Sequence, residues 1–173
     1  NLTPATTAVL NADRDLYQAE LAMREYVLLS AEGRPVAEMK KDFDDNVQQA
    51  LQRMQTAAAL VRLHDVSTMA DTEFTKIFDN WQSLAKQAMQ YAQQGNTQQA
   101  RRLIESSEAA AFSTLRDEYN GLGERIDARA IALGQELAAY VNQQRTLTIL
   151  LMLIAVAIAV YVAVAFAVGG VRR

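Results

Sequence analysis

A run of uncharged, apolar residues near the C-terminus constrains this chain more than any other feature. Residues 147–168 read LTILLMLIAVAIAVYVAVAFAV and include no charged side chain. As an α-helix this run is roughly 33 Å long, which is enough to cross a hydrocarbon core roughly 30 Å thick. Its place at the C-terminus excludes a secretory signal peptide. We therefore predict a transmembrane helix over residues 146–168 that tethers the preceding residues, 1–145, to a membrane.

The tethered residues have the composition of one water-soluble domain. The chain has 173 residues, no Cys, one His and a formal net charge of −3. Without Cys it has no disulfide framework and no thiolate metal site. The slightly acidic balance, with Lys and Arg dispersed along the chain, argues against nucleic acid as the main partner.

Apolar residues recur with the period of an α-helix throughout this domain, and no stretch of the sequence alternates like a β-strand. The pattern predicts four helices, over residues 5–31, 36–63 and 72–94 and from residue 97 onward. Gly and Pro after the first helix, and Gly-Asn after the third, mark the ends of those helices. Because no Pro follows Pro35, the fourth helix can continue without a break. The short connections predict an all-α fold, an up-down-up-down four-helix bundle whose long fourth helix continues into the transmembrane helix.

Basic residues next to the apolar run indicate its orientation in the membrane. Arg172 and Arg173 follow the run, whereas Arg145 alone lies just before it. Because basic residues favour the cytoplasmic side, we expect residues 169–173 to begin a cytoplasmic linker and the domain to lie outside the cytoplasm. Counting along antiparallel helices places residue 1 about 27 Å short of the membrane, so we expect an upstream transmembrane helix. A protein anchored only at its C-terminus is the alternative.

The first helix carries two apolar stripes, one more than a single core face needs. The first stripe has 3-4 spacing and suits the bundle core: Val9, Ala12, Leu16, Ala19, Met23, Tyr26 and Ser30. The second stripe is rotated by one residue and includes two arginines: Leu10, Arg14, Tyr17, Leu21, Arg24 and Leu28. Two adjacent stripes indicate two neighbours, the helix's own bundle and a second subunit, so we expect a homodimer.

Two arginines lack an acidic neighbour at helical spacing and indicate an anion site. Arg14 and Arg116 have no Asp or Glu at i±3 or i±4. Counting along antiparallel helices places them within about one turn of each other, and guanidinium groups bind carboxylates bidentately. The aromatic side chains expected around this anion pocket are Tyr17, Trp81, Phe112 and Tyr119. The alternative is an interhelical ion pair from Arg14 to Asp117, to Glu118 or to a partner subunit.

Arg24 and Arg101 form a second candidate pair, nearer the end of the bundle that lies away from the membrane. Each has an acid at helical spacing, Glu20 and Glu105 respectively, so an intrahelical ion pair is the alternative for both. The sequence holds no Ser/His/Asp set, Gly-rich phosphate loop or His/Cys metal spacing. We therefore expect no enzyme activity, no metal and no cofactor.

Three segments of the sequence resemble a known family. LNADRDLYQAELAMREY in the first helix resembles the periplasmic, ligand-binding four-helix bundle of bacterial methyl-accepting chemotaxis proteins. FDNWQSLAKQAMQYAQQGNTQQARRLI and AFSTLRDEYNGLGERID are similar to that family's pattern of a tryptophan, a short turn and a long helix. The resemblance covers essentially the whole chain, including the descent into a transmembrane helix.

The resemblance implies a homodimer in the bacterial inner membrane with a periplasmic sensor domain, followed by a HAMP linker and a cytoplasmic signalling coiled coil. In aspartate- and citrate-type receptors, arginines of the first helix hold the ligand's carboxylates, and Arg24 best matches their depth. The implied function is the ligand-sensing domain of a transmembrane chemoreceptor, which binds a small organic acid and signals to cytoplasmic chemotaxis proteins. The alternatives are a ligandless structural or protein-interaction bundle, and the sensor domain of a histidine kinase or cyclase.

Overall fold

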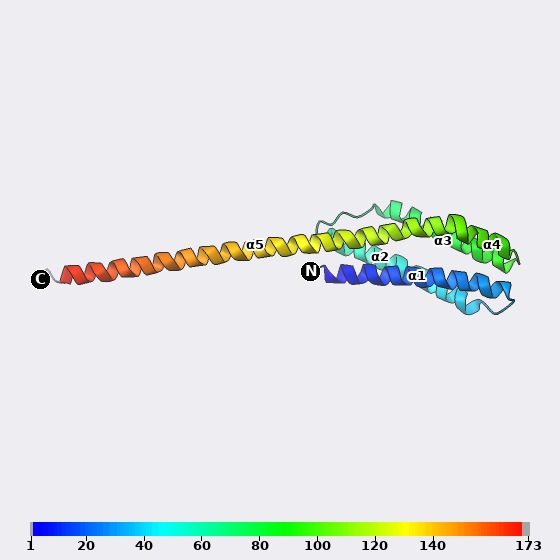
Figure 1. The fold of residues 1–173 in the computed structure, drawn as a ribbon, viewed down its shortest axis with the longest axis horizontal. Coiled ribbons are helices and arrows are strands. Elements are labelled where there is room, and N and C mark those ends of the chain that lie inside the picture. The colour runs from blue at the N-terminus through cyan, green and yellow to red at the C-terminus, as the bar shows by residue number, and fades with distance from the viewer. Residues whose placement is uncertain (1, 171–173) are drawn as a thin grey trace. The chain divides into compact units, whose positions relative to one another are not determined.

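All regular elements in the described part of the chain are helices, as the apolar periodicity predicts. The computed structural model describes the backbone of residues 2–170 and the side chains of residues 2–165. The elements, labelled in Figure 1, are α1 (Thr3–Ala31), α2 (Ala37–Arg62), α3 (Asp71–Gln93), α4 (Thr97–Leu103), the π-helix η1 (Ile104–Glu108) and α5 (Ala109–Gly170). Arg172 and Arg173, on which the predicted orientation depends, lie outside the described residues.

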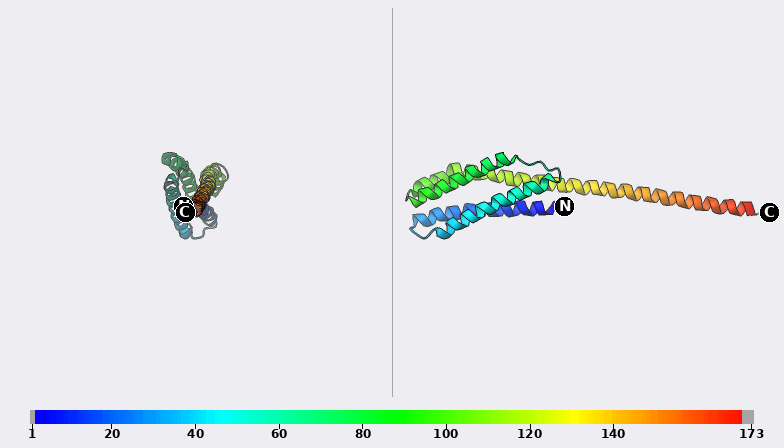
Figure 2. Two further views of the ribbon diagram at one scale, coloured as in Figure 1. Left: turned by 90° about the vertical axis from the view of Figure 1, so that its left-hand side faces the viewer. Right: turned by 180° about the vertical axis from the view of Figure 1, so that it is seen from behind.

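Two compact units make up the chain, and the first ends at Arg129. Within this first unit α1 packs against α2 and α3, and α3 packs against α4 and η1. Both views in which the helices lie along the page show α1 beside α2 and α3 beside α4 (Figures 1 and 2). The predicted core stripe of α1 is buried from Val9 to Tyr26, and only Ser30 at its end is partly exposed. The largest fully buried side chains of the other helices are Phe43, Phe78, Trp81, Leu115, Tyr119, Leu122 and Ile126.

Glycine ends two of the helices by the same backbone geometry. Gly33 has a φ of 67° and Gly95 a φ of 77°, a left-handed conformation that glycine adopts without a Cβ clash. The residue after each glycine then donates its N–H to a carbonyl five residues back, Arg34 to Leu29 and Asn96 to Tyr91, each at 2.9 Å. These bonds satisfy carbonyl groups that the ending helices leave without partners.

The fourth helix is continuous, as predicted, but one segment of it is not α-helical. A π-helical segment, η1, separates α4 from α5. Ala100, Ile104 and Glu108 are all buried, at two successive spacings of four. In an α-helix of 3.6 residues per turn this spacing drifts off the buried face, whereas the wider π turn keeps the three residues in line. The stretch from Thr97 to Ala165 is thus one continuous helix, as predicted, and η1 is a π turn within it that apolar periodicity does not reveal.

The second unit, from Ala130 onward, contains the predicted transmembrane run as part of α5. By length and composition, the helical stretch from Thr97 to Ala165 is suited to cross a membrane, and it is the only such stretch among the described residues. None of its most apolar window is buried inside the chain. The run is therefore not a core helix of this fold, and its large side chains from Leu147 to Val164 are exposed.

Candidate functional site

The first predicted anion pocket brings several of its residues together in the first unit. The Arg116 guanidinium lies over the Tyr17 ring, with 4.4 Å between its Cζ and the ring centroid, which is a cation–π contact. Tyr17 meets Phe112 edge-on at 5.6 Å between centroids, and Phe112 lies 6.0 Å from Trp81. α1, α3 and α5 thus supply one aromatic cluster, with Arg116 at its outer edge.

The two arginines of this pocket are not unpaired, contrary to the expectation from i±3 and i±4 spacing. Arg14 bonds the carboxylate of Asp15 through Nε at 3.3 Å and Nη2 at 3.0 Å. The Nε atom of Arg116 lies 3.5 Å from Oδ1 of Asp13 on α1. Arg14 also makes no bridge to Asp117 or Glu118, because its partner is the adjacent residue of its own helix.

Two further predicted site residues, Trp81 and Tyr119, belong to the core. Neither has any exposed surface. The Tyr119 hydroxyl donates to the backbone carbonyl of Ala50 at 3.3 Å, and burial raises the pKa of this phenol above its usual value. A ligand at Arg116 would therefore meet Tyr17 and Phe112, and Trp81 would support the Phe112 ring from behind.

The second predicted pair, Arg24 and Arg101, lines one open hollow between α1 and the α4–η1 stretch. Its volume is about 240 Å³, and its other lining residues are Val27, Leu28, Ile104 and Glu105. Arg24 is half exposed and pairs with Glu20 at 2.5 Å, as its i−4 spacing predicts. Arg101 is exposed, and no carboxylate of the described residues lies within ion-pair distance of it. The alternative for Arg101, an ion pair with Glu105, is not formed, although Glu105 lines the same hollow.

A buried acidic pair behind this hollow was not predicted. Glu108 of η1 has no exposed surface, and Glu20 of α1 is 5% exposed. The indole Nε1–H of Trp81 donates to Oε1 of Glu108 at 2.8 Å. Burial, and next the hydrogen bond and charge of Glu20, raise the pKa of Glu108 from 4.5 to about 8. The sequence signal was an acid at a core spacing, four residues after Ile104 and three before Ala111.

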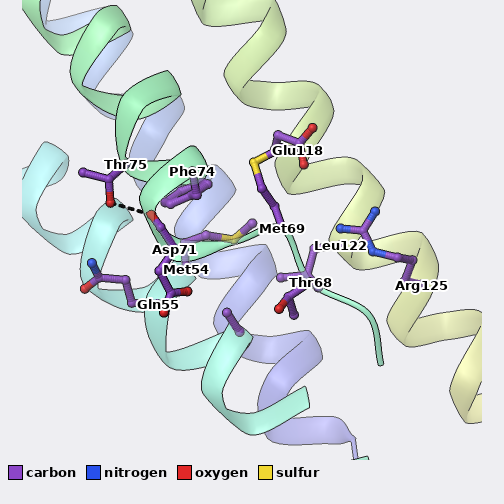
Figure 3. A pocket seen from close by; sticks show the side chains of 11 residues that line it. Met54, Gln55, Thr68, Met69, Asp71, Phe74, Thr75, Glu118, Leu122 and Arg125 are labelled. Carbon is purple, nitrogen blue, oxygen red and sulfur yellow. Dashed lines mark hydrogen bonds between the residues drawn. The ribbon is translucent and has the colours of Figure 1, made fainter. Parts of the chain in front are cut away.

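Figure 3 shows a second cavity, enclosed by α2, the connection after it, α3 and α5. Apolar side chains of Met54, Met69, Phe74 and Leu122 line it together with the guanidinium of Arg125. The Nε atom of Arg125 is buried and has no hydrogen-bond partner among the described residues. The cavity volume is about 30 Å³, which admits a water molecule or two but no metabolite.

The chain matches no protein-family model, no curated protein and no solved structure. The resemblance to chemotaxis receptors therefore remains a prediction from the quoted segments. Among the described residues, no group of three or more His, Cys, Asp or Glu side chains is placed to hold a metal ion.

Proposed function

We propose that this chain is the ligand-sensing domain of a transmembrane chemoreceptor, and that it binds a small organic acid between Arg24 and Arg101. In this proposal residues 1–145 form an up-down-up-down four-helix bundle on the periplasmic side of the bacterial inner membrane. Binding would shift the fourth helix, which continues through the membrane toward cytoplasmic chemotaxis proteins. The observation that carries the proposal is the hollow at Arg24 and Arg101, because its two walls are α1 and the start of that fourth helix.

The charge of the hollow favours it over the other candidate sites. Its volume of about 240 Å³ is larger than that of the cavity at Arg125, about 30 Å³, and smaller than those of two open hollows of about 420 and about 500 Å³ that no arginine lines. Arg101 has no acidic partner among the described residues, whereas Arg14 and Arg116 are both paired with aspartates. Arg101 can therefore bind a carboxylate without first breaking an ion pair, whereas Arg24 is already paired with Glu20. The apolar wall of Val27, Leu28 and Ile104 suits an acid with a short hydrocarbon body.

A homodimer is part of the same proposal, because the second stripe of α1 is left exposed by the other helices of the chain. Leu10, Tyr17, Leu21 and Leu28 are between 44% and 66% exposed, although each is large and apolar. Leu28 belongs both to this stripe and to the hollow. A second copy packed on the stripe would therefore close the hollow from the outside and reduce the access of water to a bound acid.

The competing function is a ligandless bundle that docks another protein, and the same exposed stripe favours it. The two functions differ in their response to small molecules, because a ligand that binds only the folded state raises the melting temperature. The test is a thermal-shift screen of the full chain, in detergent micelles, against a panel of mono-, di- and tricarboxylates. We expect at least one acid to raise the melting temperature in a dose-dependent way.

Adjacent arginines provide a matched control for the site. Arg101 lines the hollow, whereas Arg102 is exposed and does not line it. We expect Arg101→Gln to weaken binding of the acid about 10-fold or more, since a charge-assisted hydrogen bond is worth roughly 1.5–3 kcal/mol. Arg102→Gln removes the same charge and should leave affinity within about 2-fold. Equal losses in both variants, or a panel in which no acid stabilises the chain, would contradict the proposed function.

A further inference from the structure

The buried acids Glu20 and Glu108 meet where α1 faces η1. The Arg24 guanidinium reaches both carboxyl groups, at 2.5 Å from Oε1 of Glu20 and 3.8 Å from Oε2 of Glu108. The Oε2 atom of each is buried and has no hydrogen-bond donor among the described residues. Buried polar atoms without partners are rare in folded proteins, and here two of them belong to acids that face one guanidinium, so we expect a cause that they share.

One proton satisfies both orphaned oxygens. Two ionised carboxylates only accept hydrogen bonds, whereas a protonated carboxyl donates one. If Oε2 of one acid carries a proton, it donates to Oε2 of the other, and neither atom lacks a partner. The remaining oxygens already have donors, because Arg24 bonds Oε1 of Glu20 and Trp81 bonds Oε1 of Glu108.

The charges around the pair agree with one bound proton. From α1 the pair is faced by Arg24, which is 2.5 Å from Glu20 and 3.8 Å from Oε2 of Glu108. From α3 it is faced by the neutral indole of Trp81. Among the described residues, the ionisable groups that act on the Glu108 carboxyl are Glu20 and Arg24. A single guanidinium, itself half exposed, thus faces two buried carboxyl groups, and one of these is best accommodated uncharged.

We propose that Glu20 and Glu108 hold one proton between their Oε2 atoms at neutral pH, and that its release at higher pH displaces η1 from α1. The inference goes beyond the proposed function, because it needs no ligand and concerns the response of the domain to pH.

Release of the proton places two like charges side by side in the core. The interaction between them is strong where water is excluded, so the segment that yields most easily should move. We expect that segment to be η1, because it carries Glu108 and its π turn interrupts the regular α-helical hydrogen bonds of the fourth helix. The pKa of Glu108, about 8, places the transition in mildly alkaline solution.

Trp81 provides an internal reporter for this test, since it is the only Trp of the chain and bonds Glu108 directly. Its fluorescence is measured on the full chain in detergent micelles from about pH 6 to about pH 9.5. We expect a one-proton transition with a midpoint near 8. The transition should disappear in Glu108→Gln, in which the amide mimics the protonated acid. It should persist in Glu105→Gln, which alters an exposed acid of the same π-helix.

Glu20→Gln gives an independent variant, because it removes a group that raises the pKa of Glu108 without removing Glu108 itself. The midpoint should move to lower pH in this variant. The displacement is measured between spin labels at Gln18→Cys on α1 and Ser106→Cys on η1, both exposed positions in a chain without native Cys. The distance should change across the same pH range, and Glu108→Gln should suppress the change.

If a variant fails to fold, infrared difference spectra of the unaltered chain still test whether the pair holds a proton. A protonated carboxyl should be present near neutral pH and be lost as the Trp81 signal changes. A flat Trp81 titration, no protonated carboxyl near neutral pH, or a constant spin-label distance across the transition would each overturn the proposal.

Discussion

Asp15 explains at the scale of single residues why Arg14 is not a free anion-binding group. Its carboxyl group is 1% exposed, and its Oδ1 atom accepts hydrogen bonds from Arg14. Its Oδ2 atom accepts a hydrogen bond from Nη1 of Arg53 on α2. Both oxygens of this buried carboxylate therefore face a guanidinium, and the ion pair with Arg53 links α1 to α2.

Asp15 and Arg14 should differ in their effects on stability. We expect Asp15→Asn to lower the free energy of unfolding by roughly 2–3 kcal/mol, because hydrogen bonds to a charged group are worth about 1.5–3 kcal/mol. Arg14 is 55% exposed, so Arg14→Ala should cost less than about 1 kcal/mol. Urea denaturation of the full chain in micelles, followed by helicity, measures both variants. A loss for Arg14→Ala as large as that for Asp15→Asn would show that Arg14, not Arg53, is the main partner.

At the scale of helices, apolar periodicity was enough to predict most of the fold. The predicted ends of α1, α2 and α3 lie within two residues of those observed. The core stripe of α1 was predictable because its period matches a regular helix. η1 was not predictable in this way, because a template of 3.6 residues per turn contains no π turn.

The candidate site was predictable only in part. When two side chains that pair lie on different helices, the spacing of residues along the sequence does not reveal the pair. Residue counting along antiparallel helices brought Arg116 near the Tyr17 ring that it contacts. Spacing on one helix could not reveal Asp13 as the partner of Arg116, since the two residues lie on different helices. For the same reason the pairing of Glu20 with Glu108 emerges only when α1 packs against η1.

Replacing glycine by alanine should change the free energy of unfolding in opposite directions at Gly95 and Gly123. Gly95 has a φ of 77°, so Gly95→Ala should lower stability by roughly 1–2 kcal/mol. Gly123 lies within α5, and an added Cβ would be 3.8 Å from Cγ1 of Val9, an ordinary contact. Gly123→Ala should therefore raise stability by up to about 1 kcal/mol through helix propensity. The urea midpoints of the two variants give the signs, and a destabilised Gly123→Ala would refute the packing at Val9.

For the whole molecule, self-association through the second stripe of α1 is the main expectation. We expect Leu10→Glu combined with Leu21→Glu to abolish dimers of the full chain while leaving its helicity unchanged, because charges would replace exposed apolar surface. Neither residue lines the hollow at Arg24 and Arg101. Leu63→Glu is the matched control, since Leu63 is 79% exposed but follows α2. Sedimentation in micelles that shows monomers for the unaltered chain, with and without an acid, would exclude this interface.

η1 also fixes the rotational phase of everything that follows it in the first unit. A π turn holds about one residue more than an α turn, so losing it would rotate the stretch from Ala109 to Arg129 by roughly 100° about its axis. Tyr119, Leu122 and Ile126 would then turn away from the core that now buries them completely or nearly so. The surplus residue is therefore locked in place by the packing of the next five turns or so. If η1 moves away from α1, we therefore expect its π turn to be kept and the whole segment to be displaced along or across the helix axis.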